Sequence, residues 1–251
     1  MKKLKLLFLV PALFAMTACG LGSEVTKEKA QEYAEEMKKQ DEPENVTFNL
    51  KMSGTTGKEK AKMEMEYKIK TSKDAGSYYY VSMEEDGEKS LFEVYQVPND
   101  KYEEVTWVKY LEEGKEETLC YGKKDNAQYS IVTRYVMNAG MAPAMMYAMF
   151  SSPDIAAAEY EANEDYKVQY FSNGAKNLSV KVTFSETKAS DEEEYMTSGS
   201  LTITYDNYLL KSIDESATSN IGNKVSVKGN ASYGAVKLSL PSGWEDIINK
   251  E

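Results

Sequence analysis

Apolar residues alternate with polar ones over two long stretches of this chain, and this alternation limits its fold more than any other feature. In the first stretch Val46, Phe48 and Leu50 are separated by single polar residues, and the same period continues through 61–121 and 166–240. A period of two is typical of strands with one buried and one solvated face. Asp86-Gly87 and similar pairs predict tight turns, which are too short for crossover helices. The sequence therefore predicts an antiparallel sheet.

Two segments have a different period. Between Glu24 and Gln40 the apolar residues are spaced as on one face of a helix. The segment of about 125–162 is rich in Ala, Met, Tyr and Val and predicts a helical insert, with a short helix starting at Ser152-Pro153-Asp154. We therefore expect an α+β fold, with a single large curved antiparallel sheet, an unclosed half-barrel. The N-terminal helix and the insert would pack on its concave face, in one domain over 24–251.

The N-terminus predicts export and lipidation. Residues 1–18 combine lysines, a short apolar run and small residues, which is the layout of a signal peptide. Met16-Thr17-Ala18-Cys19 is similar to the bacterial lipobox, so we expect a diacylglyceryl cysteine at Cys19 after cleavage before it. Residues 19–23 are expected to form a tether. This predicts a lipid-anchored protein on the extracytoplasmic face of a bacterial membrane, with the lipid anchor as its contact with that membrane.

Composition excludes several functions. Among 251 residues there is no His, which removes Ser-His-Asp relays and His-containing zinc sites. A net charge of −11 argues against a nucleic-acid partner, because neutralising phosphates requires clustered Lys and Arg. The Gly54–Glu59 stretch lacks the spacing of a phosphate loop. We expect no catalytic residues, no metal site and no cofactor, and hence a protein that is not an enzyme.

The chain resembles the LolA/LppX-like superfamily of bacterial lipoproteins and lipoprotein carriers. The resemblance covers about Glu24 to Pro241 and rests on element order: an opening helix, strands, a helical insert and further strands. Two late segments are also similar, Gly199–Asp206 and Val236–Pro241. The resemblance implies a sheet capped by helices, with space between them for acyl chains or other apolar cargo.

Methionine spacing supplies the candidate ligand site. Met137, Met141, Met145 and Met149 recur every four residues, so a helix would place them on one face, interrupted by Gly140 and Pro143. Tyr147 of the same insert is a further candidate for the lining. Three interpretations remain open: an ordinary lid helix whose methionines fill an irregular gap, the adaptable lining of a ligand cavity, or thioether ligation of Cu(I).

These observations lead to two functional hypotheses. The first is a membrane-anchored lipoprotein that binds or carries a hydrophobic, lipid-like ligand in a cavity between sheet and helices, with Met137, Met141, Met145, Tyr147 and Met149 in contact with it. The alternative is a structural or adhesive surface lipoprotein with a filled core, acting through protein-protein contacts. A void between the insert and the sheet would distinguish the first from the second.

Overall fold

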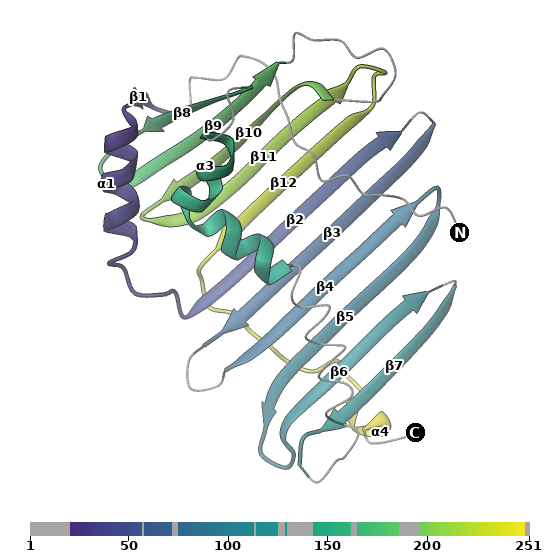
Figure 1. Ribbon diagram of the computed structural model, residues 1–251. Coiled ribbons are helices and arrows are strands. Elements are labelled where there is room, and N and C mark those ends of the chain that lie inside the picture. Colours follow the sequence, from purple (N-terminus) through teal and green to yellow (C-terminus); the bar gives the residue numbers. More distant parts are fainter. Residues whose placement is uncertain are drawn as a thin grey trace. The chain divides into compact units, whose positions relative to one another are not determined.

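The structure is a computed structural model of the whole chain, and it describes residues 21–248 except 57, 72–74, 113, 125–128, 130–142, 162–164 and 186–195. Twelve strands lie within the described residues (Figure 1): β1 Ser23–Val25, β2 Asn45–Thr56, β3 Glu59–Lys70, β4 Gly76–Glu85, β5 Glu88–Asn99, β6 Glu103–Glu112, β7 Lys115–Gly122, β8 Tyr166–Ser172, β9 Asn177–Ser185, β10 Met196–Asp206, β11 Leu209–Ser219 and β12 Lys224–Ser232. The helices with defined bounds are α1 Lys27–Met37, α3 Pro153–Glu161 and α4 Trp244–Ile247, and residues 143–151 are also helical.

The strands form one antiparallel sheet with the order β1-β8-β9-β10-β11-β12-β2-β3-β4-β5-β6-β7. Its two ends, β1 and β7, are not neighbours in that order, so the sheet is open. This confirms the predicted fold class of an α+β chain built on one large, unclosed antiparallel sheet. The tight turns expected from the sequence are present, and Asp86 and Gly87 both have positive φ, of 49° and 89°.

The chain divides into two compact units. Unit 1 holds β1, α1, α3 and strands β8 to β11, and unit 2 holds strands β3 to β7, the 143–151 helix and α4. Strands β2 and β12 contribute residues to both units.

In unit 1 the two helices lie against β8, and α3 also contacts β9. Helix α1 begins where Thr26 accepts a hydrogen bond from the backbone N–H of Lys29, as an N-cap does. Its Tyr33 packs against Tyr205 and Tyr208, with ring centroids 6.4 and 5.0 Å apart, and donates a hydrogen bond to the Lys176 carbonyl at 3.1 Å. One aromatic residue thus fixes α1 on the sheet.

In unit 2 the C-terminal segment covers one face of β6 and β7. Val105, Trp107 and Cys120 form a buried cluster, and Leu240 and Trp244 pack against it. The alternation at 236–240 predicts a last strand, but these residues form no strand. Leu240 packs as a side chain against the cluster, so this segment is bound by apolar contacts and not by a ladder of hydrogen bonds.

Candidate functional site

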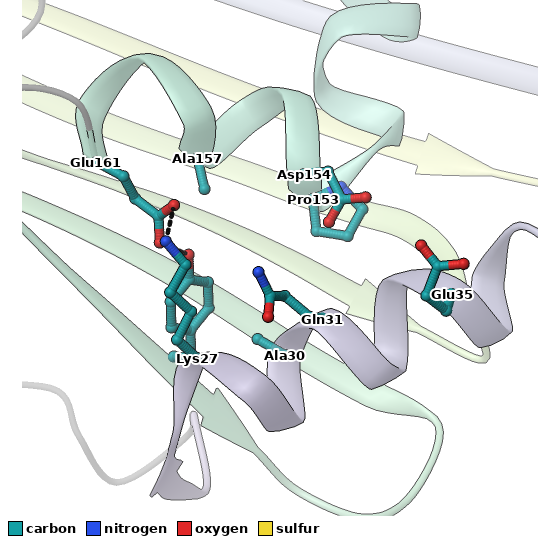
Figure 2. A pocket seen from close by; sticks show the side chains of 9 residues that line it. Lys27, Ala30, Gln31, Glu35, Pro153, Asp154, Ala157 and Glu161 are labelled. Atoms are coloured by element: carbon teal, nitrogen blue, oxygen red, sulfur yellow. Dashed lines mark hydrogen bonds and ion pairs between the residues drawn. The ribbon is translucent and has the colours of Figure 1, made fainter.

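A cleft of about 410 Å³ lies between α1 and α3 in unit 1 (Figure 2). Its apolar lining is deeply buried: Ala30 is 5% exposed, Ala157 3% and Tyr170 of β8 8%. Polar side chains complete the lining, namely Lys27, Gln31, Glu35, Asp154 and Glu161. Protein sites for small molecules typically enclose about 300–1,000 Å³ and combine an apolar surface with a few polar groups. The cleft meets both conditions.

Ion pairs join the two helices on either side of this cleft. The Nζ of Lys27 lies 2.6 Å from Oε2 of Glu161, at the first turn of α1 and the end of α3. Lys38, which follows α1, lies 2.8 Å from both Asp154 and Glu35. Two cations thus face three carboxylates, which leaves one net negative charge around the cleft.

Glu161 has both carboxylate oxygens engaged. Oε2 accepts from Lys27 at 2.6 Å and Oε1 accepts from the hydroxyl of Tyr170 at 2.5 Å. Burial alone would raise the pKa of Glu161, but these hydrogen bonds and the charge of Lys27 together hold it below its ordinary value. The pKa of Tyr170 is raised, first by burial and then by its bond to Glu161. Glu161 is therefore a carboxylate at neutral pH, Tyr170 keeps its proton, and the hydrogen bonds of Glu161 connect α1, α3 and β8.

A second, smaller crevice of about 120 Å³ lies on the other side of α1. Val25, Tyr33, Leu178 and Tyr208 give it a mainly apolar lining, and Lys29, Glu32 and Glu36 lie at it as well. Helix α1 is therefore flanked by two hollows, and only the α1–α3 cleft reaches the size of a typical ligand site.

The sequence-predicted site residues are only partly described. Cys19, Met137 and Met141 lie outside the described residues. Met145 and Met149, on the 143–151 helix, are 66% and 40% exposed. Tyr147 is half-buried in unit 2, where its ring lies 5.7 Å from that of Phe48 and 6.2 Å from that of Tyr67.

The 143–151 helix differs from an ordinary surface helix. It carries no charged residue, and its exposed positions are Met145, Ala148 and Met149. A surface helix normally has charged or polar residues on its outer face. Here Tyr147 makes the inner contacts, and the hydroxyl groups of Tyr147 and Tyr233 lie 3.5 Å apart. The helix thus presents an apolar outer face.

Unit 1 also holds a buried carboxyl that the sequence analysis did not single out. Glu215 of β11 is 5% exposed, and the strand register places it opposite Leu201, on the same face as Ile213 and Ala217. Burial raises its pKa to about 7. The signal was present in the sequence, because the two-residue period of β11 puts position 215 in phase with its buried residues.

The cleft itself was also missed by the sequence analysis. Both of its helices were expected, but nothing in their sequences indicates that segments more than a hundred residues apart form one site. Among the described residues, no three acidic or cysteine side chains are arranged to hold a metal ion. None of the helices in the described part of the chain is long and apolar enough to cross a membrane.

Comparison with family models and with curated proteins gives no match. Among solved structures, the chain is similar to LprF from Mycobacterium bovis, with 10% identity, 88% of this chain and 100% of that chain covered, and a TM-score of 0.32. A DUF1329 family protein from Desulfovibrio piger shows 11% identity, coverage of 84% and 94%, and a TM-score of 0.26. At these TM-scores the similarities carry no argument about fold family, ligand or activity.

Proposed function

We propose that this chain is a lipid-anchored protein on the extracytoplasmic face of a bacterial membrane, and that it binds a lipid-like amphiphile in the α1–α3 cleft. The observation that carries the proposal is the division of the cleft into a buried apolar lining and a charged rim. Apolar surface removed from water contributes about 25 cal/mol per Å². The rim, with one net negative charge, would hold the polar end of the same molecule.

The anchor rests on the sequence at Cys19. Two acyl chains on the mature N-terminal cysteine bury enough methylenes, at about 0.8 kcal/mol each, to keep the chain at a membrane. The test is the mass of the chain purified from membranes of the bacterium that expresses it. We expect a diacylglyceryl increment on the N-terminal peptide and its loss in Cys19→Ala. An unmodified Cys19 with the signal peptide removed elsewhere would contradict the anchor.

Ligand binding is tested by native mass spectrometry of the chain after detergent removal. We expect a bound amphiphile in the parent chain. Gln31 points into the cleft from α1 (Figure 2) and is exposed, so Gln31→Trp fills the space without disturbing a core. This variant should carry less adduct than the parent chain, whereas Gln31→Ala, which leaves the space open, should carry as much as the parent. Equal occupancy in the two variants would contradict binding in the cleft.

We also propose that a ligand contacts the apolar side chains of the insert, independently of the cleft. These residues are Met137, Met141, Met145, Tyr147 and Met149. Met145 is 66% exposed, so Met145→Asp should change the free energy of unfolding by no more than about 0.5 kcal/mol. Ile221, which is 64% exposed in unit 1, offers a matched control in Ile221→Asp. We expect the lipid adduct to fall in Met145→Asp and to persist in Ile221→Asp. Equal amounts of lipid adduct in the two variants would show that the methionines do not contact the ligand.

A further inference from the structure

The segment between the proposed anchor and the folded chain is short. Gly22 has a φ of +92°, and a Cβ at this position would lie 2.3 Å from the carbonyl oxygen of Ser172. Only glycine fits there, so the backbone of residue 22 is packed directly against the end of β8. Ser23, the next residue, pairs with Ser172 in the β1–β8 ladder. Gly22, which is packed against unit 1, thus follows Cys19 by three residues.

Covalent geometry limits how far these three residues reach. A fully extended chain spans at most about 3.6 Å per residue, so the Cα atoms of Cys19 and Gly22 lie no more than about 11 Å apart. The headgroup layer of a bilayer is roughly 5–8 Å thick on each side. An acylated cysteine keeps its own Cα within that layer. Gly22 therefore lies at most about 11 Å above the headgroup layer.

We infer that the edge of unit 1 formed by β1 and the β8–β9 turn, residues 173–176, contacts the headgroups of the membrane in which the chain is anchored. The inference rests on the lipidation at Cys19 proposed above. Other parts of the chain have no comparable limit, because the tether restricts only the residues next to its attachment point.

The α1–α3 cleft lies next to the edge formed by β1 and the β8–β9 turn. Val25 of β1 pairs with Tyr170 of β8, which lines the α1–α3 cleft. Val25 lies six residues after Cys19, so it is no more than about 22 Å from that Cα. An amphiphile could therefore pass between bilayer and cleft without crossing bulk solvent over a long distance.

The test places a nitroxide spin label at one of two exposed positions of unit 1 in the lipidated full chain, Asn173→Cys or Ile221→Cys. The register from Phe171 through Ser179 and Thr204 to Ser212 shows that the two positions lie at opposite ends of the sheet strands, on the order of 35 Å apart. Cys120 is 1% exposed and burial raises its pKa to about 12, so a thiol reagent leaves it unlabelled in the folded chain.

The labelled chain is bound to vesicles of phosphatidylethanolamine and phosphatidylglycerol that contain a Ni(II)-chelating lipid, and the relaxation of the nitroxide is measured. We expect the label at Asn173→Cys to relax several-fold faster than the label at Ile221→Cys. A spacer of about twelve Gly and Ser residues between Leu21 and Gly22, with an average span near 20 Å, should abolish this difference. Equal relaxation of the two labels in the lipidated chain without a spacer would overturn the inference.

The mass of the N-terminal peptide separates the two possible failures. If the peptide carries a diacylglyceryl group and the two labels still relax equally, the surface assignment is wrong and the anchor stands. If the peptide is unmodified, the anchor is wrong and the surface assignment fails with it.

Discussion

Each unit fixes a helix on its sheet with one tyrosine, but the outer faces of the two helices differ. In unit 1 Tyr33 of α1 packs on Tyr205 and Tyr208, and in unit 2 Tyr147 of the 143–151 helix packs on Phe48 and Tyr67. The outside of α1 is charged except at Gln31, whereas the outside of the 143–151 helix is methionine and alanine. The same kind of tyrosine packing therefore fixes two helices whose outer faces differ in polarity.

The two outer faces differ in the polar groups that they offer to a ligand. The charged face of α1 supplies ion pairs to α3 and leaves between the two helices a concave space with a polar rim. The 143–151 helix offers a convex apolar face without a polar group to orient a ligand. Orientation and specificity in small-molecule sites come from a few placed polar groups. We therefore assign recognition of the polar end of the ligand to the α1–α3 cleft.

Truncating Tyr33 should destabilise the chain more than truncating Tyr147. Tyr33 is 7% exposed and donates a hydrogen bond to the Lys176 carbonyl, whereas Tyr147 is half-buried. Removing a buried aromatic ring costs about 3–5 kcal/mol, so we expect Tyr33→Ala to lower the free energy of unfolding by about 4 kcal/mol and Tyr147→Ala by less, about 2–3 kcal/mol. Urea denaturation followed by circular dichroism measures both. The opposite order would mean that α1 is not the more firmly fixed helix.

A second prediction uses the buried carboxyl of unit 1. The pKa of Glu215 is about 7 in the folded chain, against roughly 4.3 when unfolded, so folding takes up a proton between these pH values. This group therefore favours folding most at pH below about 4, and its contribution is lost as pH rises to 7. We expect Glu215→Gln to be stabilising at pH 8 by up to about 3 kcal/mol relative to the parent, and close to neutral at pH 4.

The control for this prediction is the difference between variant and parent at each pH, because other carboxyls titrate in the same range. The pKa of Glu161 is lowered, so it contributes with the opposite sign: its stabilisation is present above the ordinary pKa of Glu and is lost as pH falls. A variant-minus-parent difference that does not change with pH would show that Glu215 is not desolvated.

The smallest expected effect concerns the ion pair at the end of the cleft. The side chains of Lys27 and Glu161 are 51% and 23% exposed, so screening by water keeps their coupling small. A double-mutant cycle with Lys27→Ala and Glu161→Gln should give a coupling of about 0.5 kcal/mol at low salt, and less in 1 M NaCl, where the Debye length is about 3 Å. A coupling several times larger would mean that this pair, and not Tyr33, holds α1 to its neighbours.

The strands and the two helices of the cleft were predictable because their signals are local. Alternation identified β2 through β12, and Ser152-Pro153-Asp154 correctly marked the start of α3. Strand β1 was missed, since three residues are too few to show a period, and its identity depends on pairing with β8. The expectation that one helix runs from Glu24 was wrong for the same reason: residues 23–25 pair as a strand before α1 begins at Lys27.

The cleft could not be predicted from the sequence, because it depends on which charged residues meet. The chain has 30 basic and 41 acidic residues, and nothing local distinguishes Lys27 and Glu161 among them. Methionine spacing, by contrast, is conspicuous in sequence and directed the ligand hypothesis to the insert. Ligand binding by Met137, Met141, Met145, Tyr147 and Met149 stays a prediction.

Photocrosslinking with a diazirine-bearing fatty acid, followed by peptide mapping of the lipidated chain, shows directly where the ligand binds. Binding in the cleft predicts adducts on peptides that contain residues 27–37 and 153–161, reduced by Gln31→Trp and retained in Gln31→Ala. Adducts confined to other parts of the chain, or equal labelling of the two variants, would contradict it.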